Sequence, residues 1–112
     1  MTGRNSAPRG YAKPIVVPDR LDLLRGPETG VVHLPRHLKW SGSAHYDLTQ
    51  PGRIVDLYRT VLNEAANQDE LHTYVNKRIL TGLWASIWLP PAVRHAWEER
   101  FPELRRRRQT AA

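Results

Sequence analysis

The sequence contains no cysteine and no long apolar run. Without cysteine the chain has no disulfide, no thiolate nucleophile and no cysteine zinc site, and this composition fits a reducing compartment. No stretch approaches the roughly 20 apolar residues that a membrane helix needs. The first residues, MTGRNSAPRGYAKP, lack the apolar core of a signal peptide. The sequence therefore predicts a cytoplasmic protein without membrane contact.

Catalytic motifs are also missing. The chain has no GxSxG nucleophile elbow, no Gly-rich phosphate loop and no HExxH zinc motif. Glu98 and Glu99 are adjacent, so a helix would point their side chains in different directions and prevent a general acid/base pair. Asp19 and Asp22 can share a helix face, but arginines surround them. We therefore expect no catalytic residue, no enzyme activity and no cofactor.

One group of histidines resembles a metal-ligand pattern. His33 and His37 are four residues apart, and His45 follows. Such a pair binds zinc when a helix brings both rings to one face, and Pro35 lies inside this one. No third ligand is evident in the sequence. Scattered surface or capping histidines are the favoured interpretation, and no metal is predicted.

The net charge of +6 is concentrated at the two ends of the chain. Residues 1–48 have a net charge of +3 and residues 49–104 a net charge of −1, while the run RRRR at 105–108 adds +4. Basic ends favour polyanionic partners such as nucleic acid or an acidic protein face. The run itself has an alternative interpretation as a solubilising end.

The N-terminal third shows weak structural signals. Residues 1–13 are polar and rich in Gly, Pro and Ser, which predicts a disordered arm. Asp19 can cap a brief helix at Arg20–Arg25, which Gly26 and Pro27 end. Val31–Leu34 reads as a short extended piece, and HLKWSGSAHYDL reads as a loop that places four side chains onto the helical body: Leu38, Trp40, Tyr46 and Leu48.

Clear helical periodicity begins near Thr49. Apolar residues follow one helix face from Ile54 to Ala65, Asp47 or Thr49 is the expected cap, and Pro51 suits the first turn. Asn67 and Glu70 then resemble a capping box. It opens a second expected helix that runs to Leu89, where a double proline ends it. Gly82 weakens this helix and can allow a neighbour to approach closely.

The stretch LTGLWASIWLPPAVRHAW holds three of the four tryptophans. Trp84 and Trp88 fall on one face of the second expected helix. Trp97 lies on a third expected helix, which Pro91 starts and Phe101-Pro102 ends. The immediate neighbours of the rings are mostly aliphatic, which favours a packed core over a base-stacking platform. One of the three rings can still belong to a partner surface.

These signals predict a mainly α protein, a small single-domain helical bundle with an extended N-terminal third that allows short strands. The expected organisation is a disordered arm at 1–13, one helical domain at 14–104 and a basic C-terminal tail at 105–112. The centre of the domain is expected to be the two-helix unit from Pro51 to Leu89.

Two stretches of the chain, LPRHLKWSGSAHYDLTQPGRIVDLYRTVLNEA and ELHTYVNKRILTGLWASIWLPPAVRHAWEERFPEL, carry a family resemblance. They resemble a group of short actinobacterial proteins with an LP..L.WS segment, a YDL.DP..R..LY..VL.EA helix and an LW..L.LP..VR.AWE..FPEL end. Members often accompany nucleotidyltransferases of the AbiEii type, the toxin half of a toxin–antitoxin pair. The resemblance covers about residues 31–104 and transfers no catalytic residues. It implies an antitoxin-like or regulatory protein that buries a toxin surface.

The sequence and the resemblance together predict an antitoxin-like module that binds and neutralises a nucleotidyltransferase-type toxin. The alternative is a DNA-binding transcriptional regulator that uses its basic ends. The expected partner-binding residues are those where charge and apolar groups coincide outside the helical core, with Trp40 as an apolar anchor. They are Arg20, Arg25, Arg36, Trp40, Arg105, Arg106, Arg107 and Arg108.

Overall fold

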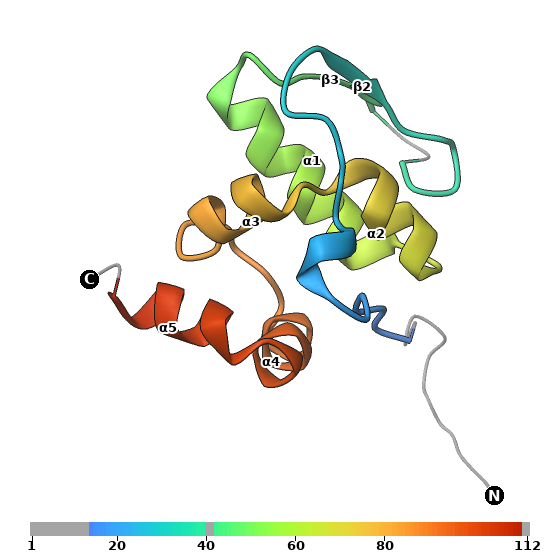
Figure 1. The fold of residues 1–112 in the computed structure, drawn as a ribbon. Coiled ribbons are helices and arrows are strands. Elements are labelled where there is room, and N and C mark those ends of the chain that lie inside the picture. Colours follow the sequence, from blue (N-terminus) through green and yellow to red (C-terminus); the bar gives the residue numbers. More distant parts are fainter. Residues whose placement is uncertain (1–13, 40–41, 111–112) are drawn as a thin grey trace, which may run out of the picture.

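The computed structural model describes residues 14–39 and 42–110. Within these ranges the expected mainly α fold is confirmed (Figure 1). The expected disordered arm and Trp40 lie outside the described residues. The elements in chain order are the 3-10 helix η2 (Leu21–Leu23), the strands β2 (Val31–His33) and β3 (His45–Asp47), and the helices α1 (Pro51–Glu64), α2 (Gln68–Tyr74), α3 (Lys77–Leu83), α4 (Pro91–Arg100) and α5 (Pro102–Thr110).

Helix α1 follows the predicted periodicity. It buries Leu57, Tyr58, Val61 and Leu62 on one face and begins with Pro51. The predicted cap is wrong, because the N-cap residue is Gln50 and its side chain makes no capping bond. Asp47 accepts hydrogen bonds from the backbone N and the hydroxyl of Thr49 at 2.9 and 2.7 Å instead. This local turn ends β3 and places Pro51 at the start of the helix.

The second predicted helix is two helices, α2 and α3, separated at Val75 and Asn76. The capping residue of α2 is correct, because Asn67 Oδ1 accepts from Glu70 N at 3.0 Å. Asn76 caps α3 in the same way and accepts from the backbone N atoms of Arg78 and Ile79. An N-cap has extended backbone, so Asn76 can begin α3 only by interrupting the helix before it.

The interruption is fixed by a segment about fifty residues earlier. Gly26 N donates to Val75 O at 2.9 Å, and Lys77 N donates to Leu24 O at 3.2 Å. The side chain of Asn76 donates to Gly26 O at 3.0 Å. A Cβ on Gly26 would lie 2.5 Å from the carbonyl carbon of Tyr74, so this close approach requires glycine.

The two strands form an antiparallel pair with Val31 opposite Asp47, Val32 opposite Tyr46 and His33 opposite His45. The extended piece at Val31 was predicted, but β3 lies in the segment predicted as a loop. Only three residues alternate there, which is too short a pattern to recognise as a strand. Val32 and Tyr46 point into the core, 7% and 1% exposed.

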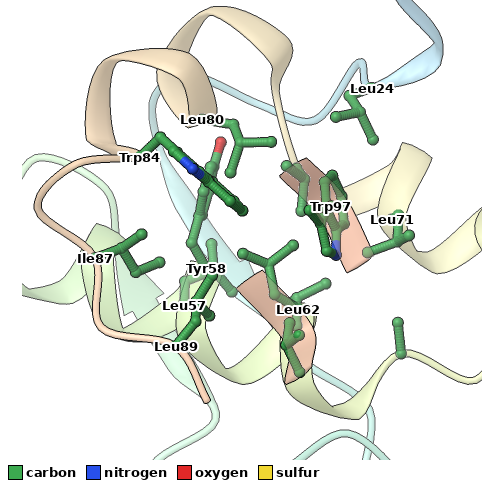
Figure 2. Packing of buried hydrophobic residues seen from close by; sticks show 14 of the residues in the cluster. Leu24, Leu57, Tyr58, Leu62, Leu71, Leu80, Trp84, Ile87, Leu89 and Trp97 are labelled. Atoms are coloured by element: carbon green, nitrogen blue, oxygen red, sulfur yellow. The ribbon is translucent and has the colours of Figure 1, made fainter. Parts of the chain in front are cut away.

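The core unites all of these elements. Trp84 and Trp97 are fully buried, with ring centroids 6.1 Å apart, and Phe101 packs on Trp97. Figure 2 shows the two rings among the buried leucines. Tyr58 is also fully buried, and its hydroxyl accepts from Asn76 N at 2.9 Å. Burial raises the pKa of Tyr58 to about 12.

The third predicted helix is confirmed as α4, which Phe101 ends. The segment expected to be a basic tail is different, because α5 continues from Pro102 to Thr110. Proline is tolerated in the first turn of a helix, so Pro102 both ends α4 and starts α5. Buried Leu104 anchors α5 on the core. No helix among the described residues is long and apolar enough to cross a membrane.

Candidate functional site

Trp88 is the most exposed large apolar side chain of the described residues, at 66%. It lies in the connecting segment between α3 and α4, residues 84–90. The sequence placed Trp88 on the same helix face as Trp84, which is wrong because α3 ends at Leu83. Beyond that point the helical spacing no longer applies. Ile87 and Leu89 turn inward at 1% and 4% exposed, and Trp88 between them turns outward.

Glu98 is a buried carboxylate at the junction of this segment with α4 and α5. It is 4% exposed and accepts a hydrogen bond from Trp84 Nε1 at 2.9 Å. Arg108 on α5 donates to both of its oxygens, from Nε at 2.7 Å and from Nη2 at 3.0 Å. Arg94, one turn earlier on α4, lies 3.7 Å from Oε2. We call these four residues the Glu98 cluster.

The Glu98 carboxylate is ionised over the whole physiological pH range. The pKa of Glu98 falls to about 2, chiefly because Arg108 donates to it, and the Trp84 hydrogen bond and the two arginine charges act in the same direction. Burial alone would raise this pKa. A carboxylate with so low a pKa is a weak base, so the cluster acts as a structural joint that attaches α5 to α4.

Arg94 fixes the connecting segment. Its guanidinium lies over the Trp84 ring, 4.9 Å from the centroid. Nη1 donates to Trp84 O at 3.2 Å, and Nη2 donates to Ile87 O. The backbone just before Trp88 is therefore held by the side chain of Arg94, which is itself paired with Glu98. Trp88 is presented on an ordered turn, which lowers the entropy lost if it is buried by a partner.

The arginines of α5 divide into two groups. Arg108 donates to Glu98 and its side chain is still 44% exposed, so it makes a structural contact while its predicted role in partner binding stays a prediction. Arg105, Arg106 and Arg107 have exposed side chains. Because Trp84 and Arg108 share the carboxylate of Glu98, the cluster places α5 beside the connecting segment. We use the name C-terminal surface for two exposed features at this end of the molecule, Trp88 on the connecting segment and Arg105, Arg106 and Arg107 on α5.

Arg20 lies close to the start of α5. It lines a cleft of about 300 Å³ that carries charges of both signs, and in this cleft Asp22 pairs with Lys77 at 2.8 Å. The hydrogen bond from Lys77 lowers the pKa of Asp22. The lining residues are Asp19, Arg20, Leu21, Asp22, Lys77, Phe101 and Glu103. Asp19 does not cap η2, and its backbone N donates to Gln68 Oε1.

The remaining predicted partner-binding residues are dispersed. Arg25 is exposed next to its bridge with Asn76, and its Nε is 3.5 Å from Asp22 O. Arg36 is exposed in the turn after β2. Figure 1 places β2 and β3 at the opposite end of the molecule from α4 and α5. Arg20 thus lies near the start of α5, whereas Arg36 follows β2 at the far end of the molecule.

The histidines do not form the pair that their spacing in the sequence would suggest. His37 pairs with Glu70 of α2. His33 lies instead opposite His45, with ring centroids 4.0 Å apart. Among the described residues there is no group of three or more histidine and acidic side chains that could hold a metal ion.

Sequence reasoning missed two residues of this region. Trp88 stands two residues before the double proline, which limits a helix to Leu89 at the latest, so the earlier end of α3 at Leu83 was not marked in the sequence. Glu98 stands four residues after Arg94, the spacing of an ion pair on one helix face, but its contact with Arg108 depends on a helix that was expected to be a tail. A scan of the chain against protein-family models and searches of curated proteins and solved structures gave no match.

Proposed function

We propose that this chain is a protein-binding module that acts through its C-terminal surface, in the manner of an antitoxin that covers a nucleotidyltransferase-type toxin. The observation that carries the proposal is an exposed tryptophan on an ordered turn, in a connecting segment whose first residue, Trp84, donates to the same carboxylate as Arg108 of the basic helix α5. Tryptophan and arginine are the residue types most enriched among interface hot spots. The toxin class rests on the family resemblance of residues 31–104.

The expected mechanism is occlusion of an acidic rim on the partner. Arg105, Arg106 and Arg107 point to different sides of α5 and give this helix a positive charge that favours encounter with acidic residues, and Trp88 supplies the apolar anchor. An isolated exposed apolar side chain needs no functional explanation. The proposal therefore depends on Trp88 and the arginines acting together: Arg94 of the Glu98 cluster holds the backbone before Trp88, and Arg108 of the same cluster attaches α5 to α4.

The test is coexpression with the product of the neighbouring gene, followed by calorimetry on the purified pair. Trp88→Ala should weaken binding by roughly 30-fold or more, the effect of removing a hot-spot side chain of about 2 kcal/mol. Val31→Ala is the matched control, because Val31 is also an exposed apolar residue, at 57%, and lies at the far end of the molecule. Failure to co-purify, or equal losses in the two variants, would contradict the proposal.

DNA binding is the second candidate, favoured by three exposed arginines within one helix. Binding to random duplex DNA should then weaken steeply as salt rises. Exchanging Arg105 and Arg107 for Gln should flatten that dependence, while Arg36→Gln, at the other end of the molecule, should leave it unchanged. Trp88→Ala separates the candidates, because it should weaken the protein complex and leave phosphate contacts intact.

A further inference from the structure

His33 and His45 form a cross-strand pair on the β2–β3 sheet. Leu34 N donates to Ala44 O at 3.0 Å, and Leu48 N donates to Gly30 O at 2.8 Å. Hydrogen-bonded and non-hydrogen-bonded pairs alternate along an antiparallel ladder. Given this register, His33 and His45 form a non-hydrogen-bonded pair, the kind in which facing side chains come closest.

The two rings lie next to each other on the solvent side of the sheet. Their centroids are 4.0 Å apart with the planes at 52°, and both residues are exposed. Two imidazole nitrogens that bind one zinc-like ion at the usual bond length lie about 3 Å apart. The Cβ atoms of facing residues in such a pair lie about 5 Å apart, so rotation of the two exposed rings about their side-chain bonds can bring one nitrogen of each to that separation.

The neighbouring charges are of both signs. Asp47 occupies the same face of β3, two residues from His45, and the hydrogen bonds from Thr49 lower its pKa. Arg53 donates to His45 O at 2.7 Å, with its guanidinium 4.3 Å from the centroid of Tyr46, whose side chain points to the core side of the sheet. Arg53 holds the backbone of β3 in place, and its guanidinium pairs with Asp56 at 3.3 Å.

We propose that His33 and His45 chelate one divalent ion of the copper, nickel and zinc class. Imidazole is a preferred ligand of these metals, whereas Mg²⁺ and Ca²⁺ favour oxygen ligands. Two protein ligands leave the other coordination positions to water or to a donor from outside the chain. This site lies at the far end of the molecule from the C-terminal surface and is independent of the proposed function.

The experiment is a titration of the full chain, without a polyhistidine tag, with Ni²⁺ followed by isothermal calorimetry. One ion should bind per chain, and Mg²⁺ at the same concentration should not bind. His33→Gln and His45→Gln should each weaken Ni²⁺ binding by at least tenfold. Both residues are exposed, so circular dichroism should show that the two variants remain folded.

His95→Gln is the matched control. His95 is an exposed histidine that pairs with Glu99 one turn along α4, and its loss should leave Ni²⁺ binding unchanged. The melting temperature of the unmodified chain should rise with Ni²⁺ and that of the His45→Gln variant should not, because an ion bound only by the folded sheet stabilises it. Equal Ni²⁺ affinity in all the variants, or equal losses including His95→Gln, would overturn the proposal.

Discussion

Gly26 and Gly82 illustrate how differently two glycines contribute to one chain. A Cβ on Gly26 would meet the backbone of Tyr74 and Val75 at 2.5–2.7 Å, whereas a Cβ on Gly82 would have no other atom within 4 Å. The sequence suggested that Gly82 allows a close neighbour, and the structure assigns that role to Gly26. Local periodicity does not reveal a close approach between segments that lie far apart in sequence.

We predict opposite effects of alanine at these two positions. Gly26→Ala should destabilise the protein by about 2 kcal/mol or more, because rigid backbone has to move to accommodate the methyl group. Gly82→Ala should stabilise it by about 0.5–1 kcal/mol, the difference in helix propensity between the two residues. Urea denaturation of both variants measures the two changes. A neutral Gly26→Ala variant would show that the approach of residue 26 to α2 is looser than described.

Helix α5 depends for its position on an ion pair that the sequence hides. Leu104 supplies the apolar contact, and Arg108 supplies the bond to Glu98. The sequence does not distinguish the four successive arginines. The orientation of α5 about its own axis determines that Arg108 is the one that contacts Glu98. The break between α2 and α3 was hidden for a related reason. Asn76 begins α3 with the support of Gly26, a residue fifty positions away.

The pKa of Glu98 predicts acid sensitivity. It is about 2 in the folded chain and 4.5 for an unperturbed glutamate, so the unfolded chain takes up the proton first. The stabilisation by Glu98 is thus complete above about pH 5 and is lost as the pH falls from 4.5 toward 2. The stabilisation is smaller than the full value of the shift, because the Arg108 side chain is 44% exposed and solvent screens its charge. Denaturant midpoints between pH 6 and pH 2.5 measure it.

Glu98→Gln is the comparison for that measurement. Its stability should be lower than that of the parent at pH 6 and should change less between pH 5 and pH 2.5, because the group that titrates is gone. Glu99→Gln, the exposed neighbour, should follow the parent curve. Parallel curves for the parent and Glu98→Gln would show that other carboxylates dominate the acid response.

The core joins the N-terminal third to the helices through its largest side chains. The sequence correctly identified Trp84 and Trp97 as core residues because each lies within a run of aliphatic neighbours at helical spacing. It was wrong about the environment of Trp88 for a physical reason. Helix α3 ends at Leu83, and Arg94 bonds to the backbone carbonyls of Trp84 and Ile87 beyond it, whereas the double proline marks only the last position a helix could reach.

Replacement of the buried tryptophans should therefore affect the entire fold. Trp84→Ala and Trp97→Ala should each cost roughly 3–5 kcal/mol, the range for removing a buried large aromatic side chain. A loss of this size approaches the total stability of a small domain. Trp88→Ala should leave the melting temperature within a few degrees of the parent. Calorimetric melting of the three variants is the measurement, and a similar loss for Trp88 would contradict its exposed position.

The hydrogen bonds between residues 24–26 and 75–77 also constrain the order of folding. Forming them closes a loop of about fifty residues, which costs about 2 kcal/mol more in chain entropy than closing a loop of five. Formation of helix α1 and of the turn into α2 closes only short loops, so it loses less chain entropy. We therefore expect the N-terminal segment to join after the helices have begun to pack. When it joins, the carbonyl of Gly26 accepts a hydrogen bond from the side chain of Asn76, the residue that caps α3. The support of this cap would then form late in folding, although Gly26 lies early in the sequence.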